Sequence, residues 1–187
     1  QDLSLTIHVA DTPAADASAA GVAVQSLTEA GIVTKVEVVP ADELWAWILP
    51  PGKFQAVYSW LGCSSVVDPY ASLRRYHPSA AVDIGVRSPG YNNMARWNTS
   101  AAQQFGQIVD EMSRTAPGQT ELIDLTRGAY ELLAHEVPFV PLVQEPIIFP
   151  FNTSRWEGWP TADDPYAMPP LSWGQFQSIV HNLKASN

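Results

Sequence analysis

The side chains that could act as nucleophiles, acids or metal ligands are few and poorly spaced. Cys63 is the sole cysteine, and only a histidine distant in sequence could activate it, so we expect a small buried side chain there. The pair His135-Glu136 begins like a metalloprotease helix but lacks the second histidine. Asp163 and Asp164 are adjacent, and adjacent carboxylates rarely flank one glycosidic bond. We therefore expect neither an enzyme nor a bound metal or other cofactor.

Aromatic rings offer a different chemistry, because flat rings can stack on the apolar faces of sugars. The segment 152–170, NTSRWEGWPTADDPYAMPP, carries two of the seven tryptophans among prolines that disfavour a regular helix or strand. Trp156 and Trp159 can either pack this tail onto a core or face a ligand, and both readings stay open. Trp45 and Trp47 lie two residues apart on an expected short helix, so they cannot both face one core, and one can lie at an interface or cleft rim.

The first sixty residues predict the elements that would position such a site. The expected elements are a strand at 3–9, a helix at 14–30, a strand at 32–39, a short helix at 42–49 and a strand at 54–60. This order predicts an α/β fold with an open, mostly parallel sheet covered on both faces. Ligands of such sheets bind beyond the carboxyl ends of the strands, which points to the stretch from Trp60 to Ser64.

The rest of the chain is expected to be more irregular. Asp68 and Pro69 suit the cap and first position of a helix, and 77–93 has the composition of a loop. Two helices are expected at about 100–115 and 119–135. The apolar, proline-punctuated stretches 137–143 and 147–149 suit edge or crossover strands, and 152–173 suits irregular structure.

Composition excludes several functions. The net charge of −9 and only ten basic residues argue against nucleic-acid binding, which needs clustered cations. A single cysteine cannot form an internal disulfide, and no stretch approaches the roughly 18 apolar residues of a membrane span. The chain starts at Gln1 without a methionine or signal peptide, which is typical of a processed or truncated piece and says nothing about export.

The order of motifs resembles the family 5 solute-binding proteins, the extracytoplasmic receptors of ABC importers for peptides, oligosaccharides and nickel. The motifs are GKFQAVYSWLG, DPYASL, GYNN, a helix pair, EVPFVPL and NTSRWEGWP followed by PYA. The resemblance covers nearly the whole chain but only the C-terminal portion of such a receptor. It implies a periplasmic-binding-protein type II-like lobe at 1–136, and a hinge crossover and tail at 137–187 that would complete the first lobe. Ligand would be captured by closure of the lobes.

The resemblance also favours an oligosaccharide as the ligand, because the ending WEGWPTADDPYAMPP is most similar to the oligosaccharide-binding branch. Peptide-binding relatives commonly carry an aspartate about three residues after the strand-end tryptophan, where Cys63 stands here. A buried ammonium without a counter-charge is costly, so a neutral sugar suits the site better than a free peptide. An oligopeptide receptor of the same family is the alternative, and a structural or interaction domain is the alternative from another class.

The resemblance and the strand-end rule together suggest ligand-binding residues. They are Trp60, Gly62, Cys63, Ser64, Asp68, Tyr91 and Asn92, with Trp159 and Tyr166 as further aromatic contacts. Asp68 can instead cap a helix, and Tyr91 and Asn92 can instead form a turn. Family members often have proline and aspartate where Met94 and Trp97 stand, so no role is transferred to Trp97. The implied partners are a solute and ABC permease subunits, and the implied location is periplasmic or extracytoplasmic, at the membrane through the transporter. The isolated piece is expected to self-associate through its C-terminal third.

Overall fold

The structure is a computed structural model that describes residues 3–12, 14–60, 68–142, 150–167 and 175–186. The chain divides into two units, Gln1–Val140 and Pro141–Asn187, and each is described by itself. The division expected between residues 136 and 137 remains a prediction, because it concerns how the chain would complete a longer receptor. Among the described residues, no helix is both long and apolar enough to cross a membrane.

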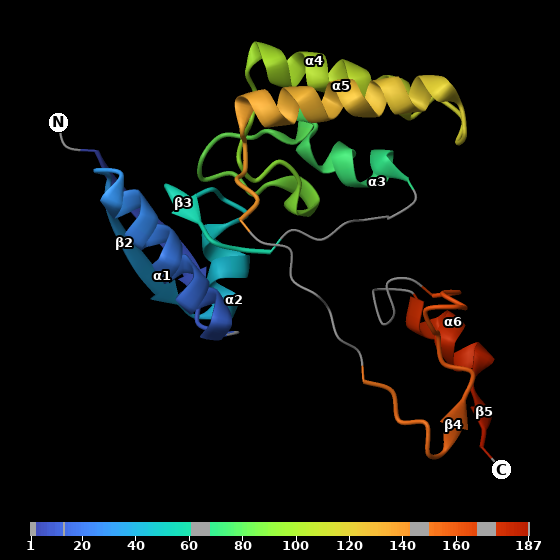
Figure 1. Cartoon of the computed structure of the whole chain (residues 1–187). Helices are drawn as coiled ribbons and strands as arrows, with labels where there is room; N and C mark the ends of the chain where they lie inside the picture. The colour runs from blue at the N-terminus through green and yellow to red at the C-terminus, as the bar shows by residue number, and fades with distance from the viewer. Residues whose placement is uncertain (1–2, 13, 61–67, 143–149, 168–174, 187) are drawn as a thin grey trace. The chain divides into compact units, whose positions relative to one another are not determined.

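A three-stranded parallel sheet lies at the N-terminal end of the first unit (Figure 1). The central strand β1 (Ser4–Ala10) pairs along its whole length with β2 (Val33–Val39), from Ser4 opposite Val33 to Ala10 opposite Val39. The third strand, β3 (Ala56–Val57), pairs with the other edge of β1 at Ile7 and His8. The expected parallel α/β arrangement is therefore confirmed, although β3 is much shorter than the expected strand at 54–60.

One face of the sheet is apolar and covered by a helix, whereas the other is mostly polar. The helix α1 (Ala14–Glu29) packs against β1 and β2, and Ile7 and Val9, which share one strand face, are buried. On the opposite face, His8 Nε2 lies 3.7 Å from Glu37 Oε2 in the described sheet. On that face, apolar cover comes at the end of the strands. The expected sheet flanked by helices is therefore confirmed.

That cover comes from a short helix that begins after β2. The segment α2 (Ala41–Glu43) continues as a π-helix over Leu44–Ile48, in which the N–H of Leu49 donates to the carbonyl of Leu44 over 2.9 Å. Its buried apolar side chains form one core with side chains at the strand ends. The members of this core are Ala10, Val39, Leu44, Ile48 and Leu49. The expected helix at 42–49 is confirmed, but its π form was not predictable from composition.

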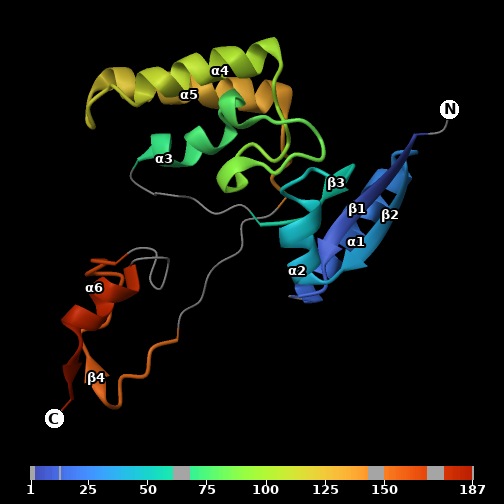
Figure 2. The same ribbon diagram turned by 180° about the vertical axis from the view of Figure 1, so that it is seen from behind.

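A group of helices makes up the rest of the first unit. The short helix α3 (Pro69–Leu73) lies near the pair α4 (Ser100–Met112) and α5 (Thr120–Glu136), which run side by side (Figures 1 and 2). Their core holds Leu73, Trp97, Ala102, Phe105, Val109, Met112, Ala129 and Leu133. The expected helix pair is confirmed.

The chain does not form the expected strand after α5, as far as residues 137–142 show. Val137 adopts a left-handed backbone with φ of 48°, which ends the helix, and the prolines that follow lack backbone donors. The ring of Phe139 stacks on Tyr76, with centroids 4.9 Å apart, so this stretch packs with the first unit. Residues 147–149, the other expected strand, lie outside the described residues.

The second unit is small and built around one helix. The strand β4 (Trp156–Glu157) pairs antiparallel with β5 (Lys184–Ala185), and α6 (Gln175–Asn182) precedes β5. Ile179 and Ala167 are fully buried within the described part of this unit. The segment 152–173 is thus less irregular than expected, because it contributes β4.

Candidate ligand-binding site

Three aromatic rings from separate parts of the first unit lie next to one another. The Trp60 side chain is 62% exposed, and its ring centroid lies 5.9 Å from that of Trp45, with the planes tilted by 50°. The Tyr91 ring centroid lies 6.3 Å from that of Trp45 in an edge-on arrangement, and Tyr91 is 45% exposed. We call Trp45, Trp60 and Tyr91 the aromatic surface.

Each ring is placed by a different element. Trp60 follows β3 by three residues, so it lies beyond the carboxyl end of that strand, as parallel sheets favour for ligand contacts. Trp45 comes from the π-helix and packs beside its buried core residues. Tyr91 comes from the turn Pro89–Tyr91. The strand-end rule therefore identified Trp60 correctly as a residue at this edge of the sheet.

The loop that carries Tyr91 is held against the end of the π-helix by hydrogen bonds. The N–H groups of Gly85 and Ser88 donate to the carbonyls of Pro51 and Pro50 over 2.7 and 2.8 Å. Arg87 Nη1 donates to the carbonyl of Ala46 over 2.8 Å, and its Cζ lies 6.0 Å from the Tyr91 ring centroid. Arg87 therefore joins the helix backbone to the aromatic surface as a planar cation.

Arg96 holds the same loop through hydrogen bonds to backbone carbonyls. Its Nη1 donates to the carbonyl of Met94 over 2.6 Å, and its Nη2 to the carbonyls of Pro50 over 2.6 Å and Val86 over 3.3 Å. Burial lowers the pKa of the Arg96 guanidinium, because the charge is partly removed from water. Its Nε atom is buried without a hydrogen-bond partner among the described residues. The contacts mark Arg96 as a structural clamp.

Several residues of this loop have a left-handed backbone conformation. The φ values are 60° at Gly90, 57° at Tyr91, 42° at Asn93 and 53° at Arg96. Such conformations are strained for residues other than glycine and persist only where surrounding contacts fix them. The GYNN motif is therefore a turn, as the alternative interpretation held, yet the turn leaves the Tyr91 ring on the aromatic surface.

Within that motif, the second asparagine is structural. Asn93 is buried, its Nδ2 donates to the carbonyl of Trp97 over 2.9 Å, and its Oδ1 accepts from the Trp97 N–H over 2.9 Å. Asn92 is half-buried, and its carbonyl accepts a hydrogen bond from the Ser88 hydroxyl. A ligand contact by the Asn92 side chain stays a prediction.

The other expected contacts fall in different places. Gly62, Cys63 and Ser64 lie outside the described residues. Asp68 caps α3, since its Oδ1 accepts the Tyr70 N–H over 3.0 Å. The helix-capping interpretation of Asp68 is thus confirmed, and a ligand contact by it stays a prediction.

Trp159 and Tyr166, the two expected aromatic contacts in the second unit, make contacts inside that unit. Trp159 stacks on Phe151 with centroids 4.7 Å apart, and its Nε1 donates to the carbonyl of Trp156 over 3.1 Å. The Tyr166 hydroxyl donates to the carbonyl of Gly158 over 2.5 Å. These contacts give both rings a packing role, and ligand contact by Trp159 or Tyr166 stays a prediction.

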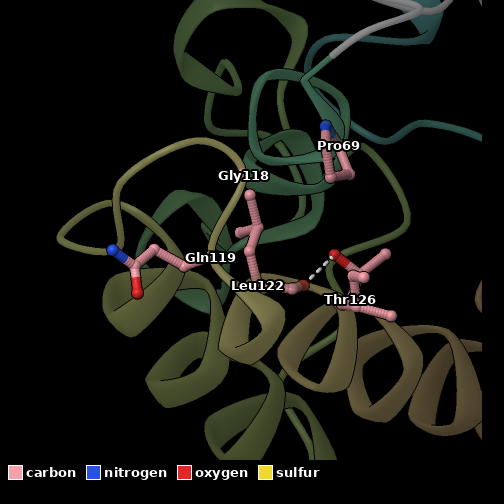
Figure 3. A pocket seen from close by; sticks show the side chains of 6 residues that line it. Pro69, Gly118, Gln119, Leu122 and Thr126 are labelled. Carbon is pink, nitrogen blue, oxygen red and sulfur yellow. Dashed lines mark hydrogen bonds between the residues drawn. The ribbon is translucent and has the colours of Figure 1, made fainter.

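Two hollows lie elsewhere in the first unit. One, of ≈ 310 Å³, is lined by Pro69, Gly118, Gln119, Leu122, Ile123 and Thr126, where the start of α5 faces the start of α3 (Figure 3). Its Thr126 hydroxyl is already bonded to the carbonyl of Leu122 over 2.6 Å. The other, of ≈ 260 Å³, is lined by Ala81, Val82, Asp83, Ile84, Arg96 and Asn98. Neither is lined by a ring of the aromatic surface.

One cluster has the residue types of a hydrolytic triad. His77 Nδ1 lies 2.7 Å from Ser79 Oγ, and His77 Nε2 lies 3.5 Å from Asp110 Oδ1. However, His77 Nδ1 also accepts the Ser79 backbone N–H over 3.1 Å, which makes it the cap of the turn Pro78–Ala80. A capped turn explains the cluster. The described residues hold no group of three or more acidic, histidine or cysteine side chains that could bind a metal.

Comparisons with known proteins identify the fold. No family model and no curated protein matches the chain. A periplasmic oligopeptide-binding protein of an ABC transporter from Thermotoga maritima matches 98% of this chain with a TM-score of 0.75 and 19% identity. The same protein with mannohexaose bound matches 99% of this chain with a TM-score of 0.72 and 19% identity.

A third structure, the ABC transporter-associated periplasmic binding protein DppA from Helicobacter pylori in complex with the peptide STSA, matches 75% of this chain with a TM-score of 0.55 and 22% identity. This chain covers 34% of each Thermotoga structure and 25% of the Helicobacter one. It therefore spans about a third of the length of the first two. The chain has the fold of periplasmic binding proteins of this kind, which confirms the fold that the sequence motifs predicted.

Proposed function

We propose that this chain is part of a solute-binding receptor of an ABC importer, and that its ligand is an oligosaccharide. The observation that carries the proposal is the aromatic surface beyond the carboxyl end of β3. Two of its rings are about half or more exposed, although burying an aromatic side chain is strongly favourable. Exposed rings at a strand end and on a strained loop suit ligand contact better than core packing.

The ligand class follows from the chemistry around these rings. Aromatic faces suit the C–H faces of sugars, while amide and guanidinium groups can bond the hydroxyls. A free peptide would bring an amino-terminal ammonium, which needs a carboxylate partner when it is buried. Asp68 is already engaged as a helix cap, and Cys63 stands where an acid is common in peptide binders.

The neighbouring structures support both the leading proposal and its alternative. The Thermotoga protein is called an oligopeptide-binding protein, yet one of its structures contains mannohexaose. The Helicobacter protein contains a tetrapeptide. An oligopeptide receptor is therefore the second candidate.

The rest of the proposed receptor follows from the family resemblance. Residues 1–136 form the second lobe, and 137–187 supply the hinge crossover and the tail that completes the first lobe. Ligand is captured as the lobes close and is delivered to permease subunits, in the periplasm or an equivalent extracytoplasmic space.

A titration distinguishes the two candidates. The indole N–H signals of the 187-residue chain are followed by NMR with mannohexaose or with the peptide Ser-Thr-Ser-Ala at millimolar concentration. We expect mannohexaose, and not the peptide, to shift the Trp60 signal. In the Trp60→Ala variant, sugar binding should weaken by roughly 1–3 kcal/mol, the scale of a large aromatic contact. Shifts with the peptide alone would favour the peptide receptor, and no shift with mannohexaose would contradict the sugar proposal.

A non-enzymatic role is part of the proposal. We expect no hydrolysis of model esters, peptides or aryl glycosides, because no activated nucleophile is visible among the described residues. Turnover that is lost on changing Cys63→Ala would contradict the receptor proposal.

A further inference from the structure

Trp45 is the one ring of the aromatic surface that touches both of the others. Its centroid lies 5.9 Å from that of Trp60 and 6.3 Å from that of Tyr91. The sequence suggested that either Trp45 or Trp47 could lie at an interface or cleft rim, and it did not say which. The structure shows that Trp47 is the exposed one, at 70%, while Trp45 is half-buried and contacts two exposed rings.

The position of Trp45 is restricted by its neighbours. It is half-buried and packs against the core formed by Leu44, Leu49 and their neighbours, which limits the positions that its ring can adopt. The carbonyl of the next residue, Ala46, accepts a hydrogen bond from Arg87, whose guanidinium also covers Tyr91. A site that is fixed before the ligand arrives loses little conformational entropy on binding.

The tilt between the rings indicates what this surface can hold. Trp45 and Trp60 are inclined by 50°, and Trp45 and Tyr91 by 62°. One face of a sugar ring cannot lie parallel to two planes inclined in this way. Two consecutive sugar units can do so, because rotation about the glycosidic bond turns one ring relative to the next.

We propose that Trp45 is a ligand-contacting residue and that the aromatic surface takes two consecutive units of an oligosaccharide, with Arg87 donating hydrogen bonds to hydroxyls at the Tyr91 end. This inference rests on the proposed sugar-binding function and adds to it a minimum ligand length and two residues, Trp45 and Arg87. The simpler role for Trp45 is packing alone, in which its ring supports Trp60 but never meets the ligand.

Ligand length separates the two roles. Mannose, mannobiose and mannohexaose are titrated into the 187-residue chain and its variants, with the indole N–H signals as the readout. The variants are Trp45→Ala, Trp45→Phe and Trp47→Ala. The last is the matched control, because it removes the same side chain from the same π-helix at a position without a ring–ring contact to any described residue.

In the native chain, we expect mannobiose to bind more tightly than mannose and to shift the Trp45 signal as well as that of Trp60. Trp45→Ala should weaken mannobiose and mannohexaose binding by about tenfold or more, the scale of losing a central aromatic contact, and mannose binding by much less. Trp45→Phe should recover part of the loss, and Trp47→Ala should change nothing.

The remaining outcomes would contradict either this inference or the proposed function. If the native chain binds mannohexaose but Trp45→Ala weakens all three sugars equally, Trp45 only supports Trp60 and this inference fails while the proposed function stands. Equal losses in Trp45→Ala and Trp47→Ala would overturn it too. Absence of any sugar binding by the native chain would overturn the proposed function itself. Should Trp45→Ala fail to fold, a Trp45 signal in the native chain that mannobiose leaves unshifted would be decisive against the inference.

Discussion

Arg96 carries its charge inside the first unit without a carboxylate, as far as the described residues show. Three backbone carbonyls, from Met94, Pro50 and Val86, surround the guanidinium instead. Carbonyl dipoles offset part of the cost of burial, and the pKa of Arg96 is lowered because desolvation remains the dominant effect. The result is a clamp that holds two stretches of chain more than forty residues apart in sequence.

Removing that clamp should cost stability. We expect Arg96→Ala to lower the free energy of unfolding by about 2–4 kcal/mol, because three hydrogen bonds to a charged group are lost. Thermal and urea unfolding measure the loss. The control is Arg114→Ala, which removes an exposed arginine paired with Glu111 at 3.0 Å and should change stability by less than about 1 kcal/mol. Equal effects of the two changes would show that Arg96 is no clamp.

The close approach of Gly52 to Arg96 gives a second test at the same place. Gly52 has φ of 70°, and a Cβ there would collide with the guanidinium. Gly31 has φ of 87° but open space around it. We expect Gly31→Ala to cost about 1–2 kcal/mol for the backbone conformation alone. Gly52→Ala should cost about 1–3 kcal/mol more than Gly31→Ala, because it also displaces the Arg96 side chain, which three hydrogen bonds hold in place.

Measuring both changes in the Arg96→Ala background isolates the collision. There the costs of Gly31→Ala and Gly52→Ala should become similar, since the obstructing side chain is gone. A persistent difference would locate the strain elsewhere.

At the scale of elements, a hydrogen-bonded carboxylate joins the start of α4 to the end of α5. Glu136 Oε2 accepts from the Thr99 hydroxyl over 2.6 Å and from Trp97 Nε1 over 3.2 Å. These hydrogen bonds, that of Thr99 first, lower the pKa of Glu136 below its ordinary value. Thr99 is also the N-cap of α4, so one carboxylate orders a helix start and a core tryptophan together.

The pH dependence of stability follows from the sign of that shift. Because the folded protein holds this proton more weakly than the unfolded chain, the stabilisation is complete above the ordinary glutamate pKa of about 4.3. The stabilisation is lost as the pH falls through the lower pKa that Glu136 has in the folded protein. We expect Glu136→Gln to flatten the fall of the melting temperature between about pH 6 and about pH 3. Glu131→Gln, at an exposed position of the same helix, should leave the profile as steep as in the native chain.

Elements with strong periodicity could be predicted from the sequence, and those set by distant contacts could not. Strand β1 shows its alternation, and Gly31 with φ of 87° ends α1 as its place in the sequence indicated. The π-helix could not be predicted from the sequence, because it packs against the strand ends and local residue patterns do not report such contacts. The missing strand at 137–142 reflects the left-handed Val137, which no propensity would suggest.

The candidate site was predicted in part for the same reason. Trp60 was identified because strand-end positions follow from element order alone. Trp45 and Arg87 were not named as site residues because their proposed roles depend on a loop that closes onto the π-helix through Arg96. The spacing of Trp45 and Trp47 was the only signal, and it could not say which ring would meet Trp60.

At the scale of the whole molecule, apolar side chains lie exposed around the junction of the two units. Val140 is 65% and Leu142 is 54% exposed. Exposing such side chains forgoes roughly 1.5–3 kcal/mol each. In the proposed receptor this stretch would meet the remainder of the first lobe, and in the isolated chain a second copy can take that place.

We therefore expect the 187-residue chain to self-associate. Light scattering across a dilution series should show a mass that rises with concentration. Changing Val140→Ser and Leu142→Ser together should lower that mass, whereas Ile84→Ser, at a more exposed position on the 81–84 loop, should not. A strict monomer at high concentration would show that the stretch needs no partner.

The wide sequence separation of the aromatic surface has a consequence for how the molecule assembles. Strands β1 and β2 and helix α1 lie within forty residues, so they can form while the chain is still short. The Tyr91 ring, by contrast, can meet Trp45 only when the loop that carries it has closed onto the π-helix, where Arg96 bonds to Pro50, and closing a loop has an entropic cost. A variant in which this loop stays open would keep its helices and sheet yet lack the Tyr91 side of the aromatic surface. Far-ultraviolet circular dichroism would score such a chain as native, so an intact binding surface must be verified by near-ultraviolet signals from the tryptophans themselves.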